Sequence, residues 1–171
     1  MPPLKGIDRG LDGDALRALE TSGHGRRLAI VDASYDIPRW AEVVDYHGLS
    51  SANALLGIVR LIPVEGELEF MSPDPPETIC AALKIFNGVA RMLEREGHLP
   101  TDEKGEATVL ERHRLDEQEE VLTQGFYSIV NDREADTLFV RTRDGLPYAC
   151  ATFVIGHSQG EYLLDPIPPS A

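Results

Sequence analysis

The sequence predicts an α/β protein: a single three-layer domain with a mostly parallel sheet and a C-terminal antiparallel hairpin. Apolar runs of strand length alternate with segments in which apolar residues recur at helical spacing. Asp144-Gly145 lies between the last two strand-like runs and has the turn signal of a hairpin. With 171 residues, of which 42% are hydrophobic, the chain can bury one core but is short for two. We expect one domain over residues 1–165 and a Pro-rich tail over residues 166–171.

Capping residues support the individual elements. The helices expected from apolar spacing cover residues 13–22, 51–62 and 77–96, with a short one at 126–130. The expected strands cover residues 28–31, 43–46, 67–71, 137–142 and 148–155. Asp12 can cap the first helix, and Gly23 can end it in a left-handed conformation. Ser50 or Ser51 can cap the second helix, and the heavily charged residues 97–120 are expected to form a surface insertion.

The charge balance limits the partners of the chain. It has 29 acidic and 16 basic residues, which give a formal net charge of −13. Such a field repels phosphate backbones and anionic lipid surfaces at long range, so we expect neither nucleic acid nor a membrane as partner. An uncharged small molecule, such as a sugar, does not feel this repulsion. The composition therefore favours a neutral ligand.

Cysteine usage and the opening residues indicate the compartment. Cys80 and Cys150 are the only cysteines, which is too few for a disulfide framework, and they lack CxxC spacing. The opening residues lack the basic and apolar regions of a secretory signal. No stretch of the sequence approaches the roughly 18 apolar residues of a membrane span. We expect a soluble cytoplasmic protein with free thiols.

A histidine between two glycines and a carboxylate at a strand end are the first candidate site residues. His24 follows the first expected helix, and Asp32 ends the strand that comes next. Polar groups at strand ends line ligand sites in α/β sheets, and an imidazole can give or take a proton near neutral pH. We expect the two side chains to face one shared cavity. Two plainer roles stay open: His24 could cap helix carbonyls, and Asp32 could be a turn residue.

Further motifs follow in an order that resembles a known family. They lie at residues 4–8, 23–25, 32–34, 47–49 and 126–127 and in the segment that reaches Tyr148. Together, over most of the chain, they resemble the L-fucose mutarotase and D-ribose pyranase family. The resemblance implies an α/β fold and the interconversion of anomers or ring forms of free monosaccharides, without cofactor or metal. It also implies homo-oligomeric rings, decamers or pentamers, with sites at subunit boundaries.

The resemblance also implies roles for single residues. His24 matches the family's proton-transferring histidine, and Asp32 matches its sugar-binding carboxylate. Tyr148 and Cys150 fall in the family's Tyr-Gly-Asn or Tyr-Ala-Asn stretch, which contacts the sugar. Tyr127 occupies the place of the tyrosine in its Phe-Tyr pair. On the residues alone, Tyr127 is equally compatible with core packing, and Tyr148 with stacking across a hairpin.

These residue types suit the chemistry of mutarotation. A cyclic hemiacetal opens when one proton moves onto the ring oxygen and another leaves the anomeric hydroxyl, so the reaction needs two proton handlers and no metal. The first hypothesis is a cofactor-independent mutarotase, an isomerase in which His24 transfers protons. L-fucose-like sugars rank above ribose because residues 23–25 and 126–127 resemble the fucose branch of the family.

Three departures from the family pattern leave other functions open. Arg26-Arg27 follows the Gly-His-Gly turn, where the family often has an acidic residue. Cys150 replaces the binding asparagine, and Thr123 or its neighbour Gln124 replaces a basic residue. These changes are compatible with a non-catalytic carbohydrate-binding or assembly protein, or with a related epimerase or isomerase. An isomerase of a phosphorylated sugar would use the charge of Arg26 and Arg27.

The remaining histidines do not form a recognisable metal-binding pattern. They are His47, His98, His113 and His157. They are dispersed, and no HxH or HxxxH spacing joins them. We therefore expect them at the surface or in loops, and we expect no metal site.

Overall fold

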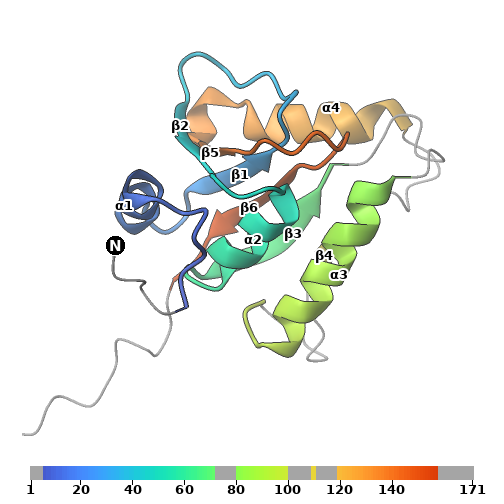
Figure 1. Ribbon diagram of the computed structural model, residues 1–171. Helices are drawn as coiled ribbons and strands as arrows, with labels where there is room; N and C mark the ends of the chain where they lie inside the picture. Colours follow the sequence, from blue (N-terminus) through green and yellow to red (C-terminus); the bar gives the residue numbers. More distant parts are fainter. Residues whose placement is uncertain (1–5, 72–79, 100–108, 111–118, 158–171) are drawn as a thin grey trace, which may run out of the picture.

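The computed structural model describes residues 6–71, 80–99, 109–110 and 119–157 of the chain (Figure 1). Within these residues the strands are β1 (Arg27–Val31), β2 (Glu42–Asp45), β3 (Val64–Phe70), β4 (Val109–Leu110), β5 (Leu138–Arg141) and β6 (Ala151–Ile155). The helices are α1 (Gly13–Thr21), α2 (Ser51–Val59), α3 (Ala81–Arg95) and α4 (Glu119–Val130), with a short 3-10 helix, η2 (Arg133–Ala135). The strands form one six-stranded sheet in the order β2-β5-β1-β6-β3-β4.

All strands of this sheet run in one direction except β6. β5 pairs in parallel with both β1 and β2, and β3 pairs in parallel with β4. β6 lies between β1 and β3 and is antiparallel to both. The prediction of a mostly parallel sheet is therefore confirmed. The predicted C-terminal hairpin is wrong, because β1 lies between β5 and β6.

The Asp144-Gly145 turn signal belongs to a crossing loop. The chain leaves β5, passes the carboxyl end of β1 and enters β6 on the far side of that strand. There the carbonyl oxygen of Asp144 accepts a hydrogen bond from the backbone N–H of Ala33 (2.9 Å). The Asp144 carboxylate accepts another from the N–H of Ser51 (3.0 Å), the first residue of α2. Asp144 thus joins the loop to two other parts of the fold, whereas a hairpin turn would join only its own two strands.

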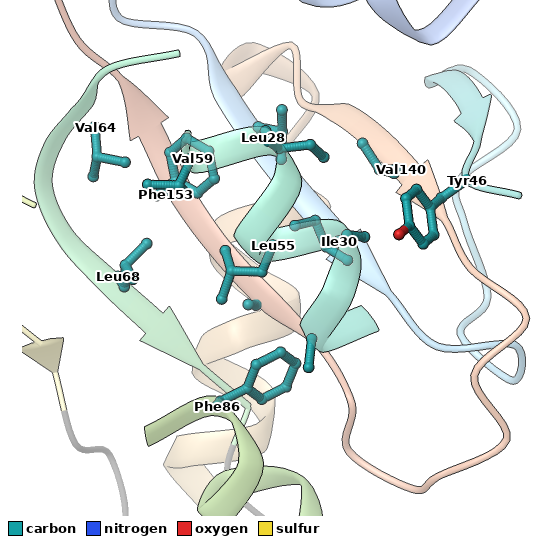
Figure 2. Close-up of a cluster of buried hydrophobic side chains, with 14 of the residues drawn as sticks. Leu28, Ile30, Tyr46, Leu55, Val59, Val64, Leu68, Phe86, Val140 and Phe153 are labelled. Atoms are coloured by element: carbon teal, nitrogen blue, oxygen red, sulfur yellow. The ribbon is translucent and has the colours of Figure 1, made fainter. Parts of the chain in front are cut away.

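Helices cover both faces of the sheet and make three layers (Figure 1). Leu28 and Ile30 of β1 pack into the cluster formed with α1, α2 and α3. Ala29 and Val31 point to the other face and pack into the cluster formed with α4. Figure 2 shows the first cluster, in which Leu55 of α2 lies among side chains of the sheet. A strand buried on both faces is typical of the centre of an α/β sheet, and the predicted fold class is confirmed.

The residues predicted to cap the first two helices do so. Asp12 accepts a hydrogen bond from the N–H of Ala15 (2.9 Å) at the start of α1. Ser50 accepts one from the N–H of Asn53 (3.1 Å) at the start of α2. The bond from Ala15 is the largest of several contacts that hold the pKa of the Asp12 carboxyl below its usual value. The start of α1 therefore loses part of its stabilisation when the pH falls far enough to protonate Asp12.

Several boundaries in the first half of the chain differ from those expected. α1 ends at Thr21 and is followed by Ser22 in an extended conformation, and the left-handed glycine is Gly25 (φ +86°) rather than Gly23. α2 ends at Val59 instead of residue 62, and β3 begins at Val64, earlier than expected. These shifts amount to a few residues. Local sequence patterns predict that an element exists more reliably than they predict the residue at which it begins or ends.

Further along the chain the differences are larger. α3 begins at Ala81, after Cys80 in an extended conformation, and α4 is much longer than the short helix expected at 126–130. The expected helix start at residue 77, most of the charged segment 97–120 and the tail 166–171 lie outside the described residues. The boundary at residue 165 stays a prediction. In the part of the chain that the structure describes, no helix is both long and apolar enough to cross a membrane.

A buried tyrosine fixes the N-terminal segment to the sheet. Tyr46 follows β2, is 2% exposed, and donates its hydroxyl proton to Asp8, whose carboxylate oxygens lie 2.9 and 3.0 Å away. Gly10 and Gly48 lie so close to this ring that a Cβ on either would come within 2.3 and 2.4 Å of ring carbons. Burial, and then the Asp8 carboxylate, raise the pKa of Tyr46. The hydroxyl therefore stays protonated and remains a donor.

Tyr46→Phe is expected to lower the free energy of unfolding by about 1–3 kcal/mol, because the half-buried Asp8 carboxylate loses a hydrogen-bond donor. Urea denaturation followed by circular dichroism measures this change. Tyr127→Phe is the matched control, since its ring is 39% exposed, and its effect should stay within about 0.5 kcal/mol. Equal effects of the two substitutions would contradict the role of Tyr46.

Candidate functional site

His24 lies at the amino edge of the sheet, between α1 and β1. Its Nε2 is 2.9 Å from Oε2 of Glu65, the second residue of β3. Its ring stacks on the ring of His157, which follows β6, with centroids 3.5 Å apart and planes 17° apart. Gly25 turns the chain from this histidine into β1 with a φ of +86°, a conformation that side-chain-bearing residues rarely adopt.

Strand register explains why these three side chains meet. In the antiparallel pair of β1 and β6, Arg27 lies opposite Val154. Before Arg27 the backbone N–H of Gly25 donates to the carbonyl oxygen of Ile155 at 2.8 Å, which keeps the residues before β1 beside those after β6 and brings His24 to His157. On the other side of β6, Glu65 pairs with the same Val154. Three neighbouring strands thus bring two imidazoles and a carboxylate to one edge.

A cavity of about 740 Å³ opens beside His24. Its polar lining comes from Glu20, Ser22, His24, Arg60, His98 and His157, and its apolar lining comes mainly from α1 and the residues around the end of α2. Small-molecule sites typically measure about 300–1,000 Å³, so this cavity is large enough for a polar small molecule. Among the residues predicted at the sugar, Asp32, Tyr127, Tyr148 and Cys150, none lines it.

Asp32 lies at the opposite, carboxyl end of β1. It is 6% exposed, and its Oδ1 accepts hydrogen bonds from the backbone N–H (2.9 Å) and the hydroxyl (2.8 Å) of Ser34. Its Oδ2 accepts a weaker bond from Sγ of Cys150, at 3.5 Å. Asp32 therefore does have the role of a turn residue, which the sequence left open. Its Oδ2 is directed toward Cys150, just before the start of β6.

An aromatic pair lies near this carboxylate. Tyr127 of α4 is 39% exposed and stacks on Tyr35, with ring centroids 5.3 Å apart and planes 25° apart. The Tyr35 hydroxyl donates to Oδ1 of Asn131 at 2.7 Å, and this hydrogen bond holds the Tyr35 ring in place beneath Tyr127. Partial burial, and then the neighbouring acidic groups including Cys150 and Asp32, raise the pKa of Tyr127. Its phenol is therefore a neutral hydrogen-bond donor on a half-exposed ring.

Tyr148 has an unusual backbone conformation at the same edge of the sheet. Its φ of +62° is rare for a residue with a side chain, and the N–H of Cys150 donates to its carbonyl oxygen at 2.8 Å. Such a conformation costs on the order of 1–3 kcal/mol and is enriched at functional sites. The predicted strand start at residue 148 is wrong, because β6 begins at Ala151. Stacking of Tyr148 across a hairpin is excluded because β1 lies between β5 and β6.

The structure brings four of the five predicted site residues toward the carboxyl edge and leaves His24 at the amino edge. Asp32 and Cys150 are in contact, and Tyr127 and Tyr148 belong to the same neighbourhood. Within one chain, His24 and Asp32 do not face one shared cavity, and a cavity that they share across neighbouring copies stays a prediction. β1, five residues long, lies between them and alone spans about 16 Å at roughly 3.3 Å per residue.

Cys150 does not reach the surface. Its side chain is fully buried and lies against Asp32, so the expectation that Cys150 itself contacts a sugar is not met within this chain. Burial, and then the charge of Asp32, raise the pKa of the Cys150 thiol well above its usual value. Its contribution is to the packing and hydrogen bonding of Asp32. Thr123 and Gln124 lie in α4, but their side chains fall outside the described residues.

A thiol-modifying reagent is expected to label Cys150 in the native protein at least about 100-fold more slowly than in urea, because only the exposed thiolate reacts. Peptide mass spectrometry of samples taken over time at pH 8 measures the rate. Asp32→Asn removes the neighbouring charge but not the burial, so this variant should label nearly as slowly as the wild type. Fast native labelling would contradict the buried position.

Three side chains near His24 were missed as site residues from the sequence. His98 and His157 were expected only as surface or loop residues, and Glu65 carried no signal beyond its charge. The positions of Glu65 and His157 depend on which strands are neighbours and in which register, and that of His98 depends on how α3 packs against the rest of the fold. A single sequence does not contain that information in its local pattern.

The two arginines after the Gly-His-Gly turn are engaged with carboxylates. Arg26 places Nη2 2.8 Å from Oε2 of Glu42 and donates from Nε to the carbonyl oxygen of Asp136, also at 2.8 Å. Arg27 places Nη1 3.8 Å from Oε2 of Glu69. Both guanidinium groups therefore neutralise acidic side chains of this chain.

The comparisons with known proteins agree with this fold. The sequence profile of the RbsD / FucU transport protein family matches residues 5–158. No curated protein matches the chain. Among the described residues, no three His, Cys, Asp or Glu side chains gather as the ligands of a metal ion would.

Several solved structures share the fold. The fucose mutarotase in complex with L-fucose from Streptococcus pneumoniae is 24% identical, with a TM-score of 0.63, over 90% of this chain and 99% of that chain. FucU from Bifidobacterium longum is 21% identical, with a TM-score of 0.63, over 89% and 98%. RbsD from Bacillus subtilis complexed with D-ribose is 15% identical, with a TM-score of 0.53, over 86% and 94%. Because the family profile covers most of the sequence, the chain belongs to the RbsD / FucU transport protein family.

Proposed function

We propose that this chain is a cofactor-independent monosaccharide mutarotase, an isomerase whose active site forms between two copies of the chain. The observation that carries the proposal is the placement of two partial sites at opposite ends of β1. One contains His24, and the other contains Asp32 with two tyrosines. Membership of the RbsD / FucU family supports sugar chemistry. A homo-oligomeric ring, a decamer or pentamer, would place the amino edge of one copy against the carboxyl edge of the next.

His24 is the proposed proton-transferring group. As an imidazolium it gives a proton to the ring oxygen of the sugar while the anomeric hydroxyl loses its proton to water, so that the C1–O5 bond breaks and a C1 carbonyl forms. After rotation about the C1–C2 bond, the neutral imidazole takes the proton back from the C5 hydroxyl. The ring closes on the other face of the carbonyl, whose oxygen regains a proton from water. Histidine suits both steps because its usual pKa is about 6.5.

The partial site at the carboxyl edge is proposed to hold the sugar. The half-exposed ring of Tyr127, supported by Tyr35, offers a flat surface for the apolar face of a pyranose. Oδ2 of Asp32 can accept a hydrogen bond from a sugar hydroxyl in addition to the weak one from Cys150. Tyr148 adds a hydroxyl at the same edge, and its positive φ supports a functional role.

L-fucose-like sugars are the proposed substrates, ahead of ribose. This ranking rests on the resemblance of residues 23–25 and 126–127 to the fucose branch of the family. The net charge of −13 supports an uncharged sugar. A phosphorylated sugar is less suitable, because Arg26 and Arg27 already contact carboxylates. The free, buried cysteines support a cytoplasmic location.

Exchange spectroscopy by NMR tests the proposal. Purified protein is added to equilibrated anomers of L-fucose, D-ribose and D-galactose, and the rate of magnetisation transfer between anomeric protons is compared with buffer alone. The expected result is exchange above buffer, faster for L-fucose than for D-ribose. Heat-denatured protein at the same concentration is the control. Absence of exchange for all sugars would overturn the enzymatic proposal.

A sugar-binding protein without turnover is the second candidate. It is favoured by Cys150, which stands where the resembled family has its binding asparagine and which lies buried in this chain. Saturation transfer from protein to sugar reports binding without requiring exchange. Binding of a sugar with exchange no faster than buffer would support this candidate over the mutarotase.

A further inference from the structure

The environment of His24 contains two contacts that together fix its ring. Glu65 contacts the imidazole at one nitrogen, with Oε2 2.9 Å from Nε2. His157 covers one face of the ring, with centroids 3.5 Å apart and planes 17° apart. One contact limits rotation of the ring about its own axis, and the other limits tilting. A histidine used only as a helix cap would need neither.

The contact with Glu65 determines which nitrogen holds the proton. An ionised carboxylate has no hydrogen to donate, and its negative charge would repel a lone pair on Nε2 at 2.9 Å, so this contact favours the proton on Nε2 of His24. In the neutral imidazole the lone pair is then on Nδ1. Nδ1 is therefore the nitrogen that remains for exchange of a proton with a substrate.

Glu65 supplies this carboxylate from a different strand. In the resembled family an acidic residue often follows the Gly-His-Gly turn, whereas here the position holds Arg26. Arg26 is turned toward Glu42 and Ser22, to which it donates at 2.8 and 3.0 Å. The acidic partner of His24 therefore comes from β3 and not from the turn that carries the histidine.

We propose that Glu65 is the positioning residue of His24: it holds the imidazole as the Nε2–H tautomer and leaves Nδ1 to transfer the proton, while His157 keeps the ring in plane. The effect on proton transfer rests on the proposed function. The effect on the tautomer does not, because it depends only on the contact between Glu65 and His24. Carboxylates orient histidines in this way at many catalytic and metal sites.

The test replaces Glu65 by Gln and measures the tautomer of His24 directly. Long-range ¹H–¹⁵N correlation spectra at a pH well above the usual histidine pKa of about 6.5 distinguish the protonated from the unprotonated ring nitrogen. The His24 signals are assigned by their loss in His24→Gln. In the wild type the Nε2–H tautomer should dominate. In Glu65→Gln a mixture is expected, because an amide can either accept from Nε2 or donate to it.

Glu67→Gln is the matched control, because Glu67 is an exposed glutamate on the same strand and undergoes the same chemical change. It should leave the His24 spectrum and the exchange rate unchanged. Glu65→Gln should lower kcat for anomeric exchange by about 10- to 100-fold with KM within about twofold. His157→Ala should raise the mobility of the His24 ring in ¹⁵N relaxation without changing its tautomer.

The outcomes separate this inference from the proposed function. If the wild type shows no exchange with any sugar, the proposed function fails, but the tautomer spectra still decide whether Glu65 positions His24. An unchanged Nε2–H pattern in Glu65→Gln would overturn the inference. A change of the same size in the His24 tautomer of Glu67→Gln would also overturn the inference. It would show that the tautomer responds to the charge of β3 and not to the contact between Glu65 and His24.

Discussion

His24→Gln is expected to slow anomeric exchange by about 10²- to 10⁴-fold, which corresponds to about 3–5 kcal/mol of activation free energy. Glutamine has a similar size and an amide that can donate to the Glu65 carboxylate, but it cannot exchange a proton near neutral pH. The change therefore removes the chemistry while the contacts of the side chain are largely preserved. Exchange spectroscopy with L-fucose measures the rate, and saturation transfer measures sugar binding on the same sample.

His47→Gln is the matched control for this substitution. His47 is also exposed and also paired with a carboxylate, since its Nε2 lies 2.7 Å from Oδ2 of Asp12, but it lies at the other edge of the sheet. It should leave the exchange rate within about twofold of the wild type. If His24→Gln had no larger effect than His47→Gln, the catalytic role of His24 would be wrong. Loss of sugar binding in His24→Gln would instead assign it a role in holding the substrate.

Local sequence patterns predicted the elements of this fold because capping and burial are local. Asp12 and Ser50 cap their helices through residues three positions further on, and β1 is apolar because both of its faces are covered. These features need no knowledge of distant residues. The α/β class and the layers follow from them, together with the alternation of helices and strands.

The strand order could not be predicted in the same way. A single turn signal suggested that β5 and β6 pair, but β1 inserts between them, and the choice between these arrangements depends on contacts more than 100 residues apart in the sequence. Asp144 illustrates the problem, since its turn chemistry is used to join the loop to Ala33 and Ser51. The sequence identified Asp144 correctly as a turn residue, but it did not identify Ala33 and Ser51 as its partners.

The direction of β6 explains which parts of the predicted site were correct and which were not. Because β6 runs against β1, the residues before β6 meet the residue after β1, which brings Cys150 to Asp32. For the same reason the residues after β6 meet the residues before β1, which brings His157 to His24. Motif order along the chain identified candidates at both ends of β1 and could not show that they face opposite edges.

Mixing two inactive variants is expected to restore activity if the active site lies between copies. His24→Gln subunits retain Asp32, and Asp32→Asn subunits retain His24. If the two are unfolded together in equal amounts and refolded, about one quarter of the boundaries in a ring will combine an intact His24 with an intact Asp32. Anomeric exchange should therefore recover to about one quarter of the wild-type rate per site, from nearly none in either variant alone. Asp32→Asn suits this purpose because an amide oxygen can still accept both hydrogen bonds from Ser34.

A second mixture makes the result decisive. Wild-type subunits mixed equally with the double variant, which carries both substitutions, should show about one quarter of full activity if each site needs two copies, and about one half if each chain contains a complete site. The second outcome, together with no recovery in the first mixture, would contradict a site shared between copies. It would assign catalysis to the cavity of about 740 Å³ beside His24, whose polar lining includes Glu20, His98 and His157. Asp32 would then keep only its role in the turn with Ser34, and Asp32→Asn alone should retain full exchange.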